Sequence, residues 1–486
     1  MNKQQMYEYL DQKKPVITKL SDCIWEYAET AFEEFQSADL LKKALQENGF
    51  SVQEKVGNIE TAFCGTYGSG GPVIGILAEY DALSGLSQKA HCAEQQALTP
   101  GGNGHGCGHN LFAGGSVGAA LAVKTYLEEN RLAGTVKLFG CPAEEGGSGK
   151  AFMAREGVFD GLDAALAWHP MGVNGIFDMS SLANYQVMYR FKGKSAHAAA
   201  SPYLGRSALD AVELMNVGAN FLREHIVPQA RVHYAIHDAG GFSPNVVQST
   251  ASVLYLIRAP KIPQVEEIYQ RVNQIAQGAA LMTGTEVEIE FVKACADLVP
   301  NKSLAAVLYR NFEEQKLPEY TEEELAFAGK IAKTAPLSEA RAQDLLDLYA
   351  AHLLQRESRE LLQKLQERDI CDILLPFSED GPNVVLPGSS DVGDVSWNVP
   401  TSQIVTACYA IGTPEHSWQL VSQDKTSIGH KGMMLAAKVL AGAAVDLLEQ
   451  PELVEKARRE FKERMNGQKY VCAIPKEVLP KAISKL

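Results

Sequence analysis

The sequence lacks any apolar run long enough to cross a bilayer. Its first residues also lack the apolar core of a secretory signal, because residues 1–6 lead directly into the polar, charged segment 8–14. These two absences predict a protein without a membrane partner and with a cytoplasmic location.

Cysteine is sparse and scattered. The nine cysteines form no dense framework, their number is odd, and they stand at positions 23, 64, 92, 107, 141, 295, 371, 408 and 472. Small secreted domains held together by disulfides have closely and regularly spaced cysteines. The pattern excludes that class and favours a reducing compartment.

Basic residues are outnumbered by acidic ones. There are 45 Lys and Arg residues against 59 Asp and Glu residues, which gives a net charge of −14. Binding to a phosphate backbone needs clustered positive charge, so a nucleic acid partner is not expected.

The chain has ample material for more than one core. Its 486 residues exceed what a single hydrophobic core usually supports, and 46% of them are hydrophobic. We therefore expect at least two domains.

Short apolar runs alternate with helical segments in the first third of the chain and again near its end. This alternation predicts an α/β domain with a mostly parallel sheet. One long helix is expected over residues 111–129, with Asn110 as its N-cap. The expected strands cover residues 73–77, 135–140, 164–167 and 403–410.

Metal-binding side chains stand in and around the ends of these strands. The loop at residues 105–110 reads His-Gly-Cys-Gly-His-Asn, which crowds three donors into one turn. Asp81, the pair Glu144 and Glu145, His169 and His416 each follow a predicted strand. Carboxyl ends of parallel strands meet at one sheet edge, so these side chains are expected to converge. The alternative is a turn with solvated histidines, a packed cysteine and two solvated glutamates.

Five of these residues form a donor set for a borderline metal such as zinc, manganese or cobalt. The set comprises Cys107, His109, Glu145, His169 and His416. Five protein donors exceed a closed tetrahedral site, and two metals sharing one ligand use them better. Of the adjacent Glu144 and Glu145, one can then bind metal while the other moves a proton.

The middle of the chain changes character. Residues 184–298 contain two groups of strands and a helix each, including a short strand at 246–247, and predict an inserted ferredoxin-like α+β domain. Residues 302–369 are helical and charged, which indicates an α-helical elaboration rather than a catalytic piece. The catalytic domain would thus comprise residues 1–183 and 299–486. An acidic run near the start, Glu26, Glu29, Glu33 and Glu34, is expected to be a solvated helix face.

With these motifs assembled, the chain resembles the dinuclear metallopeptidase family of aminoacylases and amino-acid amidohydrolases. Within it, the chain is most similar to the branch that hydrolyses aminobenzoyl-glutamate and to its dipeptidase-like relatives, because it has Asn110 where many members have Asp. The family motifs occur in order at residues 80–83, 106–110, 142–146, 168–170, 193–198, 240–247 and 416–417, and the branch-specific segments at 389–397 and 429–433.

The resemblance implies two divalent metal ions per subunit, manganese or zinc. Cys107 would bridge them, His109 and His169 would hold one, and Glu145 and His416 would hold the other.

The resemblance also implies roles for residues that do not bind metal. Glu144 would be the general base, and Asp81 would orient a ligand. The inserted domain would be a lid and dimerisation module whose His197 reaches the partner subunit's site to stabilise an oxyanion. Asn245 and Arg258 would hold the substrate's carboxylate.

The expected protein is a homodimeric amidohydrolase that cleaves an amide bond to an amino acid with a free carboxylate. Aminobenzoyl-glutamate, a folate breakdown product, is the leading substrate, and dipeptides or N-acyl amino acids are the alternative. A separate A-type partner chain remains open. The non-enzymatic alternative is a silent, metal-binding regulatory dimer, against which the presence of Glu144 argues.

Overall fold

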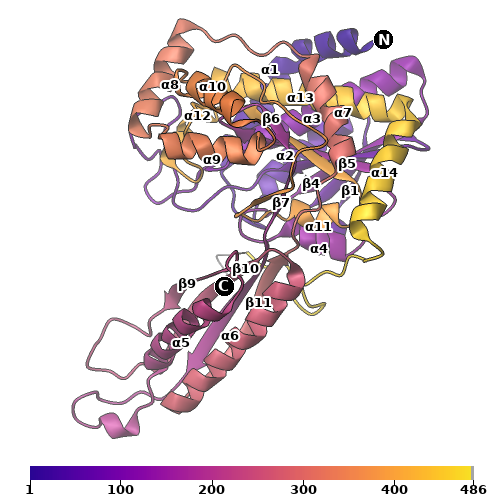
Figure 1. Ribbon diagram of the computed structural model, residues 1–486. Coiled ribbons are helices and arrows are strands. Elements are labelled where there is room, and N and C mark those ends of the chain that lie inside the picture. The colour runs from indigo at the N-terminus through magenta and orange to yellow at the C-terminus, as the bar shows by residue number, and fades with distance from the viewer. Residues whose placement is uncertain (483–486) are drawn as a thin grey trace.

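The computed structural model describes residues 1–482. The chain forms two lobes (Figure 1). The large lobe contains the α/β segments from the first third and from the end of the chain, and the smaller, elongated lobe projects from it.

A seven-stranded sheet forms the centre of the large lobe, with the strand order β1-β2-β4-β3-β5-β13-β6. The four strands β4, β3, β5 and β13 are mutually parallel, whereas β1, β2 and β6 are antiparallel to their neighbours. The mostly parallel sheet is therefore confirmed. The strands are β1 (Ser51–Glu54), β2 (Phe63–Ser69), β3 (Val73–Glu79), β4 (Gly134–Cys141), β5 (Ala164–Met171), β6 (Gly175–Phe177) and β13 (Thr401–Ala407).

Helix α3 (His109–Asn130) packs against the sheet and against α1 (Lys3–Tyr27) and α13 (Ser427–Glu449). Its small residues permit this close packing, since a Cβ at Gly114 would lie 2.6 Å from Met433 Sδ and one at Gly115 would lie 2.7 Å from the Trp168 ring. A larger side chain at either position would push the helix away from its neighbours. The remaining helices of this lobe include α2 (Phe35–Glu47), α4 (Gly149–Arg155), α7 (Lys302–Glu313), α11 (Val392–Ser396), α12 (Trp418–Gln423) and α14 (Pro451–Met465).

The smaller lobe is a four-stranded antiparallel sheet with two helices. Its strand order is β11-β8-β10-β9, and α5 (Ala208–Leu222) and α6 (Ile262–Thr283) pack against each other and the sheet. The inserted ferredoxin-like α+β lobe is thus confirmed. The expected strand at residues 246–247 is wrong, because Val246 makes only an isolated bridge with His197. The strands are β8 (Ala183–Lys192), β9 (Arg231–Asp238), β10 (Thr250–Ala259) and β11 (Glu286–Cys295).

Three helices follow α7 and lie against the large lobe: α8 (Glu322–Thr334), α9 (Glu339–Tyr349) and α10 (Gln355–Gln366) (Figure 1). Helix α7 itself is part of the core, since it packs on α13 and buries Leu304, Leu308 and Phe312. Helices α9 and α10 form a separate apolar cluster with the end of β13 and with a small parallel sheet of β7 (Met179–Ser181) and β12 (Val384–Leu386). The elaboration therefore covers the sheet edge where the predicted donors lie.

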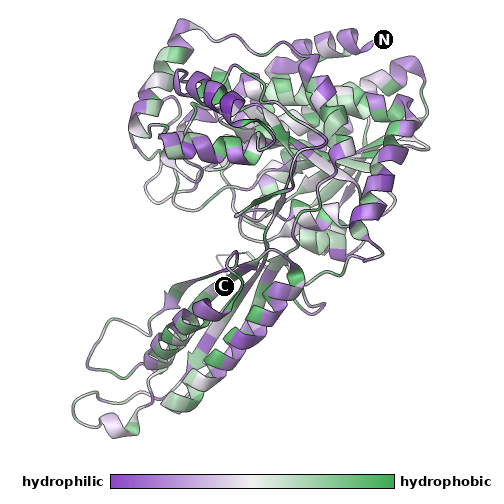
Figure 2. Cartoon of the chain, in the orientation of Figure 1, coloured by the Kyte–Doolittle hydropathy of each residue, from purple (hydrophilic) through white to green (hydrophobic). Residues whose placement is uncertain are grey.

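The outer helices carry hydrophilic and hydrophobic residues on different faces (Figure 2). Among the described residues, the structure has no helix with the length and apolar character required to span a bilayer.

Candidate metal centre

The structure brings the five predicted donors together at the carboxyl edge of the parallel strands. The ligand atoms of Cys107, His109 and His169 lie within 4.8 Å of one another, as do those of Cys107, Glu145 and His416. Cys107 belongs to both groups. His169 is within β5 and not beyond it as expected, because the strand continues to Met171.

The loop that carries Cys107 turns sharply into α3. Gly108 is the N-cap with φ 74°, and the helix begins at His109. The expected N-cap at Asn110 is therefore wrong; its side chain instead donates to Ser21 Oγ at 3.1 Å. A Cβ at Gly108 would lie 3.0 Å from Pro170, so both the conformation and the space favour glycine.

Two other residues at the site have a left-handed backbone, Ala143 with φ 61° and His416 with φ 53°. Such conformations cost about 1–3 kcal/mol and persist where surrounding contacts enforce them. Ala143 is held by the buried Glu34, whose Oε1 accepts its backbone N–H at 2.9 Å. The expectation that the acidic run is solvated is wrong for Glu34, because the carboxylate binds the loop that presents Glu144.

Asp81 links two predicted ligands. Its Oδ1 lies 2.8 Å from His109 Nδ1, and its Oδ2 accepts the backbone N–H of Glu145 at 2.9 Å. Burial alone would raise the pKa of Asp81, but the ion pair with His109 lowers it on balance. A carboxylate at Nδ1 fixes the imidazole orientation and leaves Nε2 as the free ring nitrogen.

Several donor atoms are buried but unsatisfied. Within residues 1–482, His109 Nε2 and Glu145 Oε1 have no hydrogen-bond partner. His109 Nε2 does lie 3.2 Å from Glu79 Oε2, within ion-pair distance but without hydrogen-bond geometry. Buried polar atoms are rarely left without a partner. These open nitrogen and oxygen atoms lie beside the Cys107 thiol, and a mixture of N, O and S ligands fits a site for a borderline metal.

The two remaining histidines point a ring nitrogen at the same centre. His169 Nδ1 lies 2.9 Å from Pro170 O, and its Nε2 lies 3.5 Å from Cys107 Sγ. Burial, assisted by the nearby His109, lowers the pKa of His169 to about 4, which keeps it in the neutral form that binds metals. His416 Nε2 lies 3.3 Å from Glu145 Oε2.

Glu144 is half-buried next to these donors, and its carboxylate lies within 4.8 Å of the ligand atoms of His109 and Glu79. Burial raises its pKa well above the usual value, and the neighbouring Glu79 and Asp391 raise it further. A carboxyl group in such surroundings accepts and holds a proton readily.

A buried ion cluster that the sequence reasoning missed lies beneath the site. Lys150 Nζ lies 2.6 Å from both Glu79 Oε1 and Asp391 Oδ1, and all three side chains are buried. The backbone N–H of Lys150 also donates to Asp391 Oδ2 at 2.8 Å. The sequence analysis assigned no role to Glu79 or Lys150, and Asp391 stood only within the branch-specific segment 389–397.

The three predicted lid residues are not part of this group of donors. His197 is on a loop of the lid, and its Nδ1 accepts the backbone N–H groups of Ala199 and Ala200 at 3.2 and 3.1 Å. Asn245 is exposed, and Arg258 Nη1 donates to Ser389 Oγ at 2.8 Å. In the described chain, none of the three has a hydrogen bond or ion pair to the five donors.

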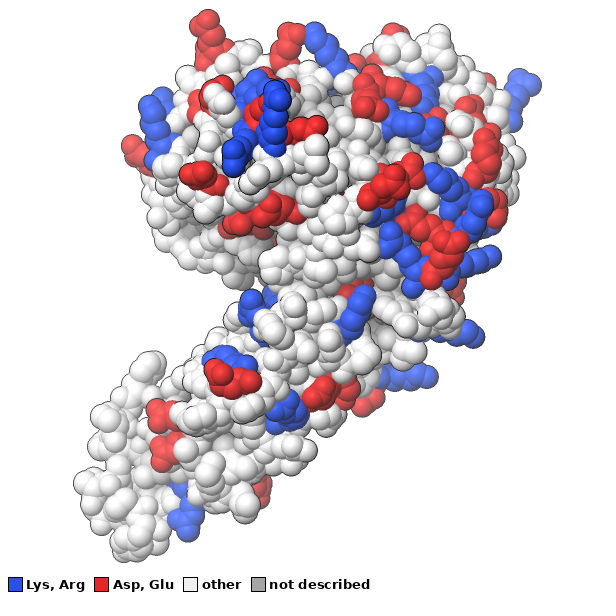
Figure 3. Space-filling view, in the orientation of Figure 1, with Lys and Arg blue, Asp and Glu red and all other residues white. Residues whose placement is uncertain are grey.

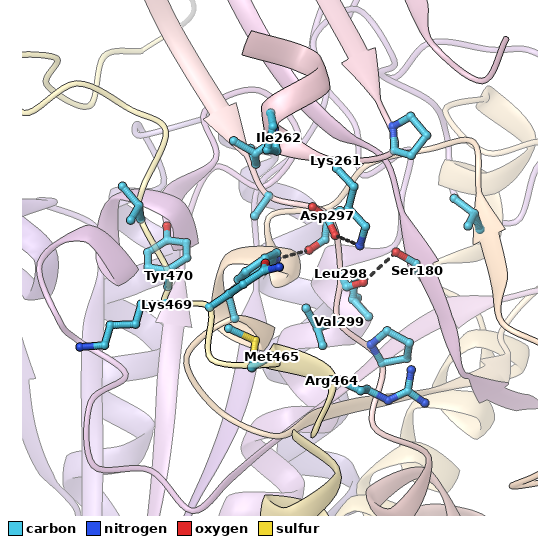
Figure 4. Close-up of a pocket in the computed structure, with 18 of the residues that line it drawn as sticks. Ser180, Lys261, Ile262, Asp297, Leu298, Val299, Arg464, Met465, Lys469 and Tyr470 are labelled. Carbon is cyan, nitrogen blue, oxygen red and sulfur yellow. Dashed lines mark hydrogen bonds and ion pairs between the residues drawn. The ribbon is translucent and has the colours of Figure 1, made fainter. Parts of the chain in front are cut away.

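A separate cavity of about 840 Å³ lies where the two lobes join (Figure 4). Lys261 Nζ forms an ion pair of 2.6 Å with Asp297 Oδ2 there, and Trp397 and Tyr470 contribute to the wall. The predicted site residues, all of them among residues 1–482, do not line it. This cavity belongs to the junction of the lobes and not to the metal centre.

The sequence model of Peptidase family M20/M25/M40 matches residues 75–345, which are more than half of the chain. The chain belongs to this family. As an M20 peptidase it is a metal-dependent hydrolase of amide bonds, as the donor set led us to expect.

The similarity to individual relatives extends over nearly the whole chain. It is 50% identical over 481 residues to the B-type subunit of p-aminobenzoyl-glutamate hydrolase from Escherichia coli, covering 98% of this chain and 99% of that protein. It is 29% identical to the mouse Xaa-Arg dipeptidase, over 95% of this chain and 92% of the dipeptidase. The fold is shared with the crystal structure of an aminobenzoyl-glutamate utilization protein from Klebsiella pneumoniae, with a TM-score of 0.57, 17% identity and coverage of 91% and 98%.

Proposed function

We propose that this M20 peptidase hydrolyses p-aminobenzoyl-glutamate to p-aminobenzoate and glutamate at a centre that holds two divalent metal ions. The observation that carries the proposal is the pair of three-donor groups that share Cys107. The substrate is proposed from the 50% identity to the E. coli hydrolase chain over nearly the full length of both proteins. Dipeptides or N-acyl amino acids are the alternative substrates.

His109 and His169 would hold one ion and Glu145 and His416 the other, and Cys107, which belongs to both donor groups, would contribute to each. Manganese or zinc suits this mixture of thiolate, imidazole and carboxylate. Metal ions held there would polarise the scissile carbonyl and lower the pKa of the attacking water.

The chain's own residues perform the proton transfers. Glu144 accepts a proton from the attacking water and passes it to the leaving nitrogen, since its carboxylate lies within 4.8 Å of the His109 ligand atom without belonging to the five donors. Asp81 acts through His109, since its Oδ1 lies 2.8 Å from Nδ1 and holds the imidazole in one orientation. Glu34 keeps the Glu144 loop in its left-handed turn.

The lid supplies the groups that bind the reacting substrate. Because His197 Nδ1 accepts two backbone N–H groups, the ring proton of the neutral imidazole stands on Nε2, which can donate to an oxyanion. Asn245 and Arg258 bind the free carboxylate of the amino acid. Since His197 lies apart from its own metal centre, we assign it to the site of a second copy of the chain, together with Asn245, whose backbone O accepts the N–H of Ala198 at 2.9 Å.

An apolar surface on the lid supports a homodimer through this lobe. Phe221 and Phe242 are strongly exposed there, and the edge strand β9 exposes Ile236. The far end of the lid also carries few charged side chains on the face shown in Figure 3. Several large apolar side chains left exposed on one lobe favour an interface between copies of the chain there. A further A-type partner chain is the alternative assembly, because the E. coli relative is named as one of two subunit types of its hydrolase.

The nine cysteines are all free thiols, which fits a reducing compartment, and we propose a cytoplasmic location on that ground.

A substrate panel tests the proposed reaction. Manganese-loaded and zinc-loaded protein is expected to release glutamate from p-aminobenzoyl-glutamate faster than it cleaves N-acetyl amino acids or dipeptides. Product formation is measured by chromatography for each substrate. Turnover of dipeptides with no turnover of any glutamate conjugate would reverse the substrate assignment.

Subunit mixing tests the role of His197. Glu144→Ala and His197→Ala homodimers are each expected to be nearly inactive, whereas a mixed dimer contains one site with both residues intact and should regain about half of the wild-type activity per dimer. Differently tagged chains allow the mixed dimer to be purified before assay. A verified mixed dimer without recovered activity would show that His197 does not act across the dimer.

A further inference from the structure

A second cavity, of about 310 Å³, opens directly beside the metal centre. One wall is helix α9 of the helical elaboration, and the other is the end of β5 with the loop at residues 412–415. Its lining includes Met171, Arg341, Asp344, Leu345, Leu348 and Glu415.

Some residues that line the cavity are close neighbours of donor residues in the sequence. Glu415 precedes the donor His416, whose backbone N–H donates to Gly106 O at 2.8 Å, next to Cys107. On the other wall, Met171 lies two residues beyond the donor His169, and Tyr409 Oη donates to Pro170 O at 2.5 Å. On both of its walls the cavity thus has lining residues one or two positions from a donor, close enough to receive the group on one side of the scissile bond.

Helix α9 presents one face to the cavity. Arg341, Leu345 and Leu348 follow at helical spacing, Leu337 stands just before the N-cap Ser338, and all four are half-buried. The segment is anchored, because a Cβ at Gly412, which has φ 81°, would lie 3.1 Å from Leu337 Cβ. Leu345 and Leu348 pack at the rim of the apolar cluster that joins the elaboration to the sheet.

Arg341 is unusual among the residues of this wall. Within the described chain its guanidinium has no hydrogen bond or ion pair, although it interacts electrostatically with Glu415. A planar guanidinium over an apolar floor provides a stacking surface for an aromatic ring. Asp344 and Glu415 add acceptors for an N–H donor, and with two acidic groups against one basic group they disfavour a carboxylate.

We propose that this cavity is the subsite for the acyl group of the substrate and selects an aromatic ring that carries an amine. The ring lies between Leu345, Leu348 and the Arg341 guanidinium, and the amine donates to Asp344 or Glu415. This inference rests on the proposed function, because the opposite end of the substrate, the amino acid carboxylate, is assigned to the lid. The elaboration thus contributes specificity to the reaction.

Paired substrates test the subsite. The kcat/KM values of wild type and Arg341→Ala are measured for p-aminobenzoyl-glutamate, benzoyl-glutamate and N-acetyl-glutamate, with the exposed Arg356→Ala on α10 as the matched control. Arg341→Ala is expected to lose about tenfold on both aromatic substrates, mainly through KM, and to stay within about twofold on the acetyl substrate. Asp344→Asn is expected to affect p-aminobenzoyl-glutamate more than benzoyl-glutamate. The control should match the wild type on all three.

Equal effects on aromatic and acetyl substrates, or no effect on any, would overturn the proposal. A further pair, p-aminobenzoyl-glutamate and p-aminobenzoyl-alanine, separates the two ends of the substrate. If the Arg341→Ala loss vanished with alanine, the cavity would hold the glutamate side chain and the acyl assignment would be wrong. If the wild type did not hydrolyse p-aminobenzoyl-glutamate but hydrolysed the other two substrates, the proposed substrate would be wrong. The comparison of benzoyl-glutamate with N-acetyl-glutamate would still test whether the cavity binds the aromatic ring.

Discussion

Glu144→Gln is expected to lower kcat for p-aminobenzoyl-glutamate by roughly 10²–10⁴-fold, the range that general acid–base catalysis contributes. The glutamine keeps the size and polarity of the side chain but cannot accept the proton of the attacking water. Because Glu144 is not among the five proposed ligands, metal content and KM should change little. Steady-state kinetics and metal analysis on the same sample measure both effects.

The control for this variant is Glu128→Gln, which alters an exposed glutamate paired with Lys124 far from the sheet edge and should leave kcat unchanged. A Glu144→Gln enzyme with kcat close to that of the wild type would mean that another group moves the proton. Loss of metal together with activity would instead make Glu144 a ligand.

Lys150→Met is expected to reduce the free energy of unfolding by about 3–5 kcal/mol, the usual cost of removing one partner from a buried ion cluster. The change leaves the buried Glu79 and Asp391 carboxylates, each 2.6 Å from Nζ in the wild type, beside a side chain that no longer carries charge. Urea unfolding of the metal-loaded protein measures the loss. Lys124→Met, which removes a lysine from a surface pair, should cost less than about 1 kcal/mol.

If Lys150→Met does not fold, the triple variant Lys150→Met, Glu79→Gln, Asp391→Asn separates the causes. It removes the unpaired charges, so it should regain folding and part of the lost stability. A Lys150→Met protein as stable as the wild type would show that the cluster contributes no net stabilisation.

The sequence was informative about the metal centre because three of the five donors, Glu145, His169 and His416, follow or end a parallel strand. Cys107, Glu145, His169 and His416 are far apart in sequence, yet the common edge of β4, β3, β5 and β13 determines that their loops meet. The topology of a parallel sheet makes this convergence predictable. The same argument placed Asp81 at the centre.

The supporting contacts were not predictable in this way. Lys150 and Asp391 are 241 residues apart, and Glu34 and Ala143 are 109 apart. No spacing or periodicity connects such pairs, since only the packing of distant segments brings them together. The residue type does not reveal whether a carboxylate is buried or solvated, so Glu34 was assigned to the wrong environment.

The helical elaboration illustrates a different limit. Its composition predicts helices, and α8, α9 and α10 are present. Its charge suggested a solvated addition without a part in catalysis, but α9 turns Arg341 and two leucines toward a cavity beside the metal centre. Which face of a surface helix meets the active site depends on tertiary packing that the helical period alone does not specify.

Metal stoichiometry tests the central claim most directly. Metal-free protein is titrated with manganese or zinc while bound metal per chain and hydrolysis of p-aminobenzoyl-glutamate are followed together. We expect activity to reach its maximum at two ions per chain, and Cys107→Ala to bind both ions more weakly because both donor groups include Cys107. Full activity with one ion per chain, or a Cys107→Ala variant that binds two ions as tightly as the wild type, would contradict the account.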